Sequence, residues 1–276
     1  MTTAPPHVPV LRPMRALLVV FGVLTFLAVA ALFVRPETTD RYFAWTIKPP
    51  LTAAFLGAAY LAGCTLVVLS LRAVAWAHAR AGVVTILVFT VLTLVATLAH
   101  LDRFHLQAGG APARAAAWFW LAVYVSVPVV MVVLLALQQR TAGVHPGRDQ
   151  PLPRWLAVAV AAEGAVMFVV GAVLFVSPGA LAWPWALSAL TSRAVGAWLV
   201  SFGLAAGLAV AEADLPRLRA PAIAYLVFGL AEIAAVLRYA GTVRWGSAPA
   251  IVYIASLALV TATAAAGVRL TSGGRP

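Results

Sequence analysis

The sequence predicts an all-α polytopic membrane protein with about eight transmembrane helices, arranged as two parallel four-helix repeats. Of its 276 residues, 63% are hydrophobic and 10% are charged, whereas a soluble domain averages about 25% charged residues. The apolar residues form long runs, each close to the ~20 residues that cross a bilayer. An internal repeat divides these runs into two sets of four.

The predicted spans follow one another with short polar loops between them. The first follows Arg15 and, at about 19 residues, is too long for the apolar part of a signal peptide. Pro128 lies inside the fourth span, where we expect a kink that neighbouring helices tolerate. The spans are 16–34, 51–71, 82–99, 115–137, 155–176, 186–211, 221–239 and 248–268.

The repeat is visible in two similar blocks, 31–63 and 173–207. Each block has Leu-Phe-Val-x-Pro, a loop with Trp and Pro, and a helix that begins Leu-Thr-x-x-x-x-Gly-Ala. Beyond the blocks, the spacing that aligns Gly57 with Gly196 also aligns a Leu-Val-Phe tripeptide in both halves. Because four spans return the chain to its starting side, we expect the halves to be related by an axis along the membrane normal.

This division sets the predicted boundaries. The two four-helix repeats occupy 15–139 and 155–268, joined by a cytoplasmic linker at 140–154 whose Pro, Gly and charge content is typical of a tether. The Pro- and Thr-rich segment 1–14 is expected to be a mobile tail, and 269–276 a short C-terminal tail.

The basic residues predict orientation rather than nucleic-acid binding. The net charge of +11 comes from 19 Lys+Arg against 8 Asp+Glu, a balance that suggests a nucleic-acid partner in a soluble protein. Here the basic residues fall singly in short loops, as retention of positive charge in the cytoplasm predicts. We therefore expect both termini in the cytoplasm. The Ala-, Val- and Arg-rich composition suggests a GC-rich bacterial genome and hence a plasma-membrane location.

Three ionisable side chains form a candidate intramembrane polar site: Arg193, Glu232 and Glu163. Placing an ionisable side chain in hydrocarbon costs free energy, so such residues are found there mainly where they form pairs or have a function. Helix rise places Arg193 within reach of Glu232, with Glu163 about a turn too deep. We therefore predict an Arg193–Glu232 ion pair, either structural or part of a binding or proton-linked site. At the matching positions the first half has, in order, Ala54, Thr93 and Phe21.

Four residues in the outer loops form a candidate contact surface: Trp45, Lys48, Trp183 and Trp185. Their rings are expected at the headgroup level of the membrane, where amphipathic aromatic residues are enriched. Because both loops lie on one side of the membrane, the alternative is a surface that contacts lipid or a partner.

Metal, cofactor and catalytic sites are not indicated. His100, Asp102 and His105 fit no structural zinc spacing and are expected in a solvated loop. A haem between helices usually needs axial histidines within the membrane, whereas the histidines here lie at span ends or in loops. The single cysteine, Cys64, allows no disulfide within the chain. We expect no cofactor and no metal, and the balance is against an enzyme.

The block from Leu190 to Gly241 resembles the four-helix membrane units of the DoxX-like group. In that group an Arg-x-x-Gly near the start of the second helix precedes a Gly-rich span, and here those positions are Arg193 and Gly196. The resemblance covers about 153–268 and reaches the first half through the repeat. It implies a four-helix bundle in each half and no particular activity.

Two classes of function remain open. The first is a non-enzymatic structural or accessory protein that binds lipid or a membrane partner, with a dry interior packed through pairs such as Gly203 and Gly207. The alternative is a transporter or small-molecule binder that uses Arg193 and Glu232, which requires a water-accessible cavity reaching Glu232. The bilayer is the expected partner in both cases; another membrane protein and the oligomeric state are left open.

Overall fold

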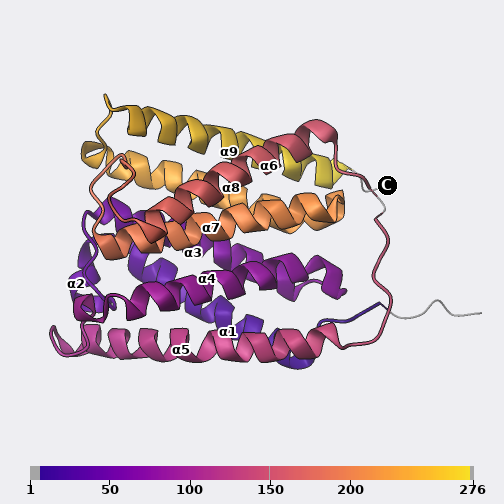
Figure 1. The fold of residues 1–276 in the computed structure, drawn as a ribbon, viewed down its shortest axis with the longest axis horizontal. Helices are drawn as coiled ribbons and strands as arrows, with labels where there is room; N and C mark the ends of the chain where they lie inside the picture. Colours follow the sequence, from indigo (N-terminus) through magenta and orange to yellow (C-terminus); the bar gives the residue numbers. More distant parts are fainter. Residues whose placement is uncertain (1–6, 149, 274–276) are drawn as a thin grey trace, which may run out of the picture.

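The computed structural model describes residues 7–148 and 150–273. Within these residues the regular elements are helices and there is no β-strand, which confirms the predicted all-α membrane fold. Eight of the helices are long and apolar enough to cross a membrane, and they run along the long axis of the molecule (Figure 1). They are α1 (Arg12–Val29, continued by the π-helical η1, Ala30–Val34), α3 (Pro50–Leu71), α4 (Arg80–Leu98), α5 (Ala111–Gln139), α6 (Arg154–Val176), α7 (Ala189–Glu212), α8 (Leu215–Arg238) and α9 (Ala248–Gly273).

Prolines and a serine mark where several helices begin. Proline occupies the first turn of α1, α3, α5 and α8, where its fixed φ suits the helix and its missing N–H costs no bond. Ser188 caps α7 by accepting a hydrogen bond from the backbone N–H of Thr191 at 3.2 Å. The loops contain the short elements η2 (Pro36–Thr38), α2 (Thr39–Tyr42), η3 (Trp76–His78), η4 (Leu101–Arg103) and η5 (Ala240–Thr242).

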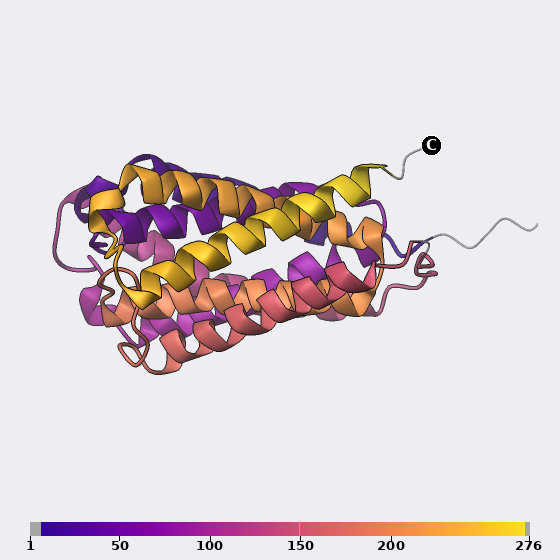
Figure 2. The ribbon, with the colours of Figure 1, turned by 90° about the horizontal axis from the view of Figure 1, so that it is seen from above.

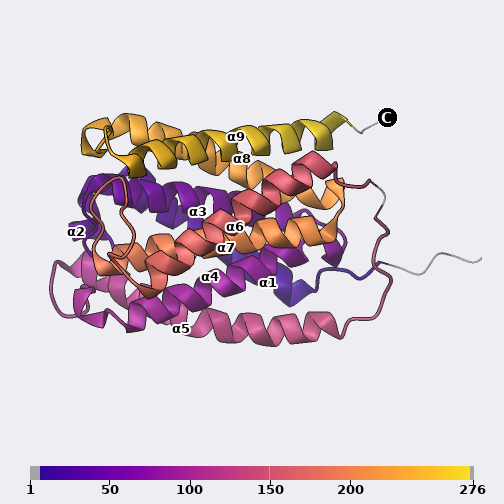
Figure 3. The same cartoon turned by 45° about the horizontal axis from the view of Figure 1, so that its top comes forward.

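The eight helices divide into an inner and an outer set. In the inner helices α3, α4, α7 and α8, half or more of the most apolar stretch is buried, whereas in α1, α5, α6 and α9 less than a third is. Each outer helix packs on one inner helix: α1 on α3, α5 on α4, α6 on α7 and α9 on α8. Figure 3 shows α9 and α5 at opposite margins of the bundle, and in Figure 2, seen from above, α9 lies in front of the other helices.

The inner helices pack across the two halves of the chain. Among the inner helices, α3 packs mainly on α8 from the second half and α7 packs mainly on α4 from the first, while α3–α4 and α7–α8 contacts are few. The core is therefore shared between the two halves of the chain. The exchange is reciprocal, because the second helix of each half packs on the third helix of the other.

Glycines bring α6 and α7 into backbone contact. A Cβ on Gly203 would lie 2.5 Å from the carbonyl oxygen of Gly164, and one on Gly196 would lie 2.6 Å from that of Gly171. A side chain at these positions would push the helices apart. Close approach through small residues is how membrane helices gain packing energy, because lipid is as apolar as the side chains it replaces.

Some predicted boundaries are wrong because polar contacts extend order beyond the apolar runs. The expected tail 1–14 is folded from residue 7: Val8 and Val10 are buried, and the Val8 N–H donates to the Val144 carbonyl at 3.2 Å. Residues 1–6 lie outside the described residues. The expected C-terminal tail is helical to Gly273, with 274–276 outside the described residues. The seventh span begins at Leu215 instead of Pro221, which lies inside α8.

We predict that Gly203→Ala lowers the free energy of unfolding by about 1–3 kcal/mol, the usual cost of overpacking. Gly207→Ala is the matched control one turn away, because a Cβ there meets no atom within 4 Å. It should leave stability unchanged or raise it slightly, since Ala is the better helix former. Thermal unfolding of both variants in detergent checks this. Equal melting temperatures for the two variants would show that backbone contact does not hold α6 on α7.

Candidate functional site

Arg193 binds a histidine of the first half instead of a carboxylate. Its Nη1 lies 2.9 Å from Nε2 of His100, at the end of α4, and Nδ1 of His100 lies 3.1 Å from the Ala96 carbonyl oxygen. Since an arginine can only donate, His100 accepts at Nε2 and donates from Nδ1, which is one neutral tautomer. Arg193 thus joins α7 to α4 across the two halves.

Glu232 is fully buried and binds a tyrosine of α9. Its Oε1 accepts a hydrogen bond from the Tyr253 hydroxyl at 2.5 Å, while its Oε2 has no partner. The predicted Arg193–Glu232 ion pair is therefore wrong. The reason is that the two helices have different neighbours: α7 faces α4 and α6, whereas α8 faces α3 and α9. The depth of a residue along the membrane carries no information on which helices are neighbours.

Glu163 of α6 is bound separately. Its Oε1 accepts from the Thr263 hydroxyl of α9 at 2.7 Å, and the side chain lines a small cavity of about 30 Å³ together with Tyr225. The three residues of the candidate polar site therefore lie in three different contacts and form no common site.

The three predicted contact-surface tryptophans are buried. Trp45, Trp183 and Trp185 are 3%, 9% and 2% exposed, so the expected exposed aromatic surface is wrong. The outer loops fold inward and cover the ends of the inner helices: Trp185 donates from Nε1 to the Thr52 hydroxyl at 2.9 Å. Lys48 alone of the four is exposed, at a cleft of about 530 Å³ that Glu37 also lines.

An ion pair across the outer end joins α8 to the first outer loop. Arg238 Nη2 lies 3.0 Å from Glu37 Oε1, which also accepts from the Tyr239 hydroxyl. The hydrogen bond from Tyr239 and the charge of Arg238 together lower the pKa of Glu37 below its ordinary value. The Arg238 side chain is half-exposed at this end.

A buried ion cluster of Arg80, Glu212, Asp214 and Arg217 lies at the opposite end, beside the linker. Glu212 binds Arg80 Nε through Oε1 and Arg217 Nη1 through Oε2, both at 2.5 Å, and Arg217 Nε lies 3.4 Å from Asp214 Oδ2. Only Arg80 is substantially exposed. Two positive and two negative charges balance, and the pKa of neighbouring His78 is lowered by its burial and by Arg217, which favours its neutral form.

The ion cluster also fixes the linker. Arg217 Nη2 donates to the carbonyl oxygens of Pro146 and Gly147 at 2.6 and 3.2 Å, and the Leu215 N–H donates to the Gln150 carbonyl at 2.8 Å. The linker is thus held against α8 instead of acting as the free tether that its composition predicted. A signal was present in the sequence: two acids and an arginine lie within six residues at the start of the seventh span.

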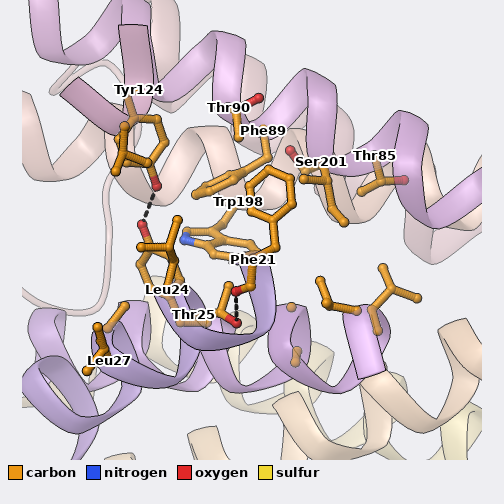
Figure 4. Close-up of a pocket in the computed structure, with 18 of the residues that line it drawn as sticks. Phe21, Leu24, Thr25, Leu27, Thr85, Phe89, Thr90, Tyr124, Trp198 and Ser201 are labelled. Carbon is orange, nitrogen blue, oxygen red and sulfur yellow. Dashed lines mark hydrogen bonds between the residues drawn. The ribbon is translucent and has the colours of Figure 1, made fainter. Parts of the chain in front are cut away.

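An apolar cavity of about 240 Å³ lies among the helices of the first half, with α7 and α8 at its back. Figure 4 shows Phe21 and Leu24 of α1 facing Phe89 of α4 and Trp198 of α7 across it. Leu27 and Phe119, 53% and 55% exposed, also line it, so it reaches the bundle surface between α1 and α5. None of its lining residues, all in the described part of the chain, is charged.

The contacts of α1 and its continuation η1 with α3 change along the membrane. Near the outer end, a Cβ on Gly57 would lie 2.5 Å from the Phe33 backbone nitrogen, so η1 and α3 touch there. Deeper in the membrane, Cys64 of α3 stands at the position that the repeat aligns with Gly203 of α7. The Cys64 Sγ lies 3.8 Å from the Gly22 carbonyl oxygen, so a side chain lies between the helices at this level.

Comparison with family models, with curated proteins and with solved structures gives no match for this chain. Within the described residues, no group of three or more His, Cys, Asp or Glu side chains is placed to hold a metal ion. The apolar cavity is the candidate ligand site because it lies among the helices and reaches the bundle surface, whereas the buried charges bind one another and link helices.

We predict that Glu212→Gln lowers the free energy of unfolding by about 3–5 kcal/mol, because it leaves the buried Arg217 short of a charged partner. Asp102→Asn is the control: Asp102 pairs with Arg103 at 3.0 Å, but both are about 70% exposed, and such pairs contribute about 0–1 kcal/mol. Chemical unfolding in detergent measures both variants. A loss for Glu212→Gln no larger than the control would show that the cluster does not hold the two halves and the linker together.

Proposed function

We propose that this protein is a non-enzymatic integral membrane protein that binds a lipid chain, or an equally apolar molecule, in the cavity of its first half. The observation that carries this proposal is the uncharged 240 Å³ cavity, which opens between α1 and α5 toward the region that lipid occupies. A ligand could enter from the bilayer sideways, without crossing water.

The size and lining of the cavity favour an apolar occupant. Apolar cavities of ~150 Å³ in proteins stay dry and bind benzene, so a larger one accommodates a longer or two-ringed molecule. Side chains that face an empty void lose their dispersion contacts on that side. An apolar ligand restores those contacts, and aromatic rings such as Phe89 and Trp198, 4.0 Å apart between centroids, already form a packed wall.

The alternative of a transporter that uses Arg193 and Glu232 has no supporting geometry. The two side chains lie in separate contacts, and Glu232 has no exposed surface. We also propose that the exposed apolar faces of α1, α5, α6 and α9 contact lipid or another membrane protein, since both offer the same apolar chemistry.

We propose a bacterial plasma-membrane location with both termini in the cytoplasm. The bias of the basic residues supports this, and so does the position of the linker at the same end of the bundle as the start of α1 and the end of α9 (Figure 1). We also infer that the halves are repeats of one unit. The shared sequence blocks and the reciprocal contacts of α3 with α8 and of α7 with α4 support that inference.

We predict that Ala28→Phe blocks ligand binding. Ala28 is half-buried on α1 and lines the cavity, so a phenyl ring there occupies the space. Val23→Phe is the matched control, because Val23 is 56% exposed on the same helix and does not line the cavity. A diazirine-bearing lipid in vesicles should label cavity peptides of the wild type and Val23→Phe but not of Ala28→Phe. Equal labelling of these peptides in all three proteins would refute binding in the cavity.

The proposed orientation predicts the behaviour of reporter fusions. A C-terminal alkaline phosphatase fusion should be inactive and a C-terminal fluorescent protein fusion active in bacterial cells, because the C-terminus stays in the cytoplasm. A phosphatase inserted in the outer loop after Arg103 should be active. The opposite pattern would invert the proposed topology.

A further inference from the structure

The hydroxyl groups that line the cavity differ in whether each one donates a hydrogen bond to another group of the protein. Five of them donate to backbone carbonyls, which satisfies their hydrogen-bonding potential without help from a ligand. These are the hydroxyls of Thr25, Thr85, Thr90, Ser201 and Tyr225. They therefore present mainly their carbon atoms to an occupant.

Tyr60 of α3 and Tyr124 of α5 differ from these. Their hydroxyl oxygens lie 2.7 Å apart, and Figure 4 shows the Tyr124 hydroxyl directed at this contact across the cavity. Each tyrosine carries one proton, and one shared hydrogen bond uses only one of the two. Both side chains are more than nine-tenths buried, so water does not readily accept a hydrogen bond from the second hydroxyl. The Thr93 hydroxyl lies beside that of Tyr124, so three hydroxyl protons serve two contacts and one donor stays unused in an apolar wall.

A buried donor without an acceptor is destabilising, and a ligand oxygen that accepts its hydrogen bond removes that cost. We propose that the ligand carries a neutral carbonyl oxygen that binds the Tyr60–Tyr124 pair, while its apolar part fills the cavity. This inference rests on the proposed function and specifies the ligand class. The uncharged wall disfavours a carboxylate, because no positive group would balance its charge.

Depth excludes the ester groups of an intact phospholipid. Tyr60 lies about ten residues beyond the start of α3, or about 15 Å along the helix at 1.5 Å per residue. This is close to the middle of a hydrocarbon core ~30 Å thick, whereas phospholipid esters lie at its edges. The carbonyl must therefore belong to a molecule that dissolves in the bilayer interior, such as a ketone on an apolar skeleton.

Benzophenone and diphenylmethane test this inference, because they differ only in a carbonyl in place of a methylene. Each is used to displace the diazirine lipid from the cavity of the full-length protein in vesicles. Benzophenone should displace it at an about tenfold lower membrane concentration, as expected for one net hydrogen bond. The preference should disappear in the Tyr60→Phe/Tyr124→Phe double variant, in which diphenylmethane should displace the probe as before.

The two single tyrosine variants and Thr93→Val test which hydroxyl causes the preference for benzophenone. Tyr60→Phe or Tyr124→Phe alone leaves one hydroxyl with an unused proton, so each should retain the preference. The Thr93 hydroxyl is also buried, in a small neighbouring cavity that Tyr60 lines. A preference that survives in the tyrosine double variant but is lost in Thr93→Val would overturn the assignment.

Two other outcomes separate this inference from the proposed function. Equal displacement by both compounds in the wild type would refute the carbonyl contact and leave apolar binding in place. If the diazirine lipid labels the cavity in no variant and neither compound raises the melting temperature, the cavity binds nothing and both proposals fail.

Discussion

The spacing of backbones between neighbouring helices controls most features of this fold. In a membrane, helices gain little from hiding apolar surface, so close van der Waals contact decides which helices associate. Four glycines, facing each other in pairs at two levels, let α6 and α7 touch along their backbones. At the aligned position of the first half, the Cys64 side chain lies against α1. The second half contains a cavity of about 30 Å³ beside α6 and α7, whereas the cavity of the first half is about 240 Å³.

The exchange of inner helices makes the two halves depend on each other. Because α3 packs on α8 and α7 on α4, polar groups at both ends of the bundle also join the halves. Arg193 reaches His100 at the outer end, and Arg80 reaches Glu212 at the other. Buried charges are weak contributors to stability when compared with apolar replacements, yet they specify which helices are partners, since a mismatched charge would be left unpaired.

The candidate sites show where reasoning from one helix at a time fails. Hydropathy and the 1.5 Å rise gave depths for Arg193 and Glu232, but a depth does not say which face of a helix a residue occupies or which helix it faces. The tryptophans were expected at the membrane surface because their residue type is common there. Here Trp45, Trp183 and Trp185 cover the ends of the inner helices and are buried. The cavity combines six helices, so no local pattern could indicate it.

The sequence by itself determined that the chain is a helical membrane protein with eight spans. A membrane span needs about 20 apolar residues and must form its backbone hydrogen bonds within itself. Each span can therefore be recognised from its own segment of sequence. The sequence also determined the approximate ends of most spans and the similarity of the halves. Only the tertiary structure decided that α3 and α7 exchange partners, that Arg217 holds the linker and that Tyr60 meets Tyr124. These contacts join residues far apart in the chain, and their formation depends on packing of whole helices that no single segment encodes.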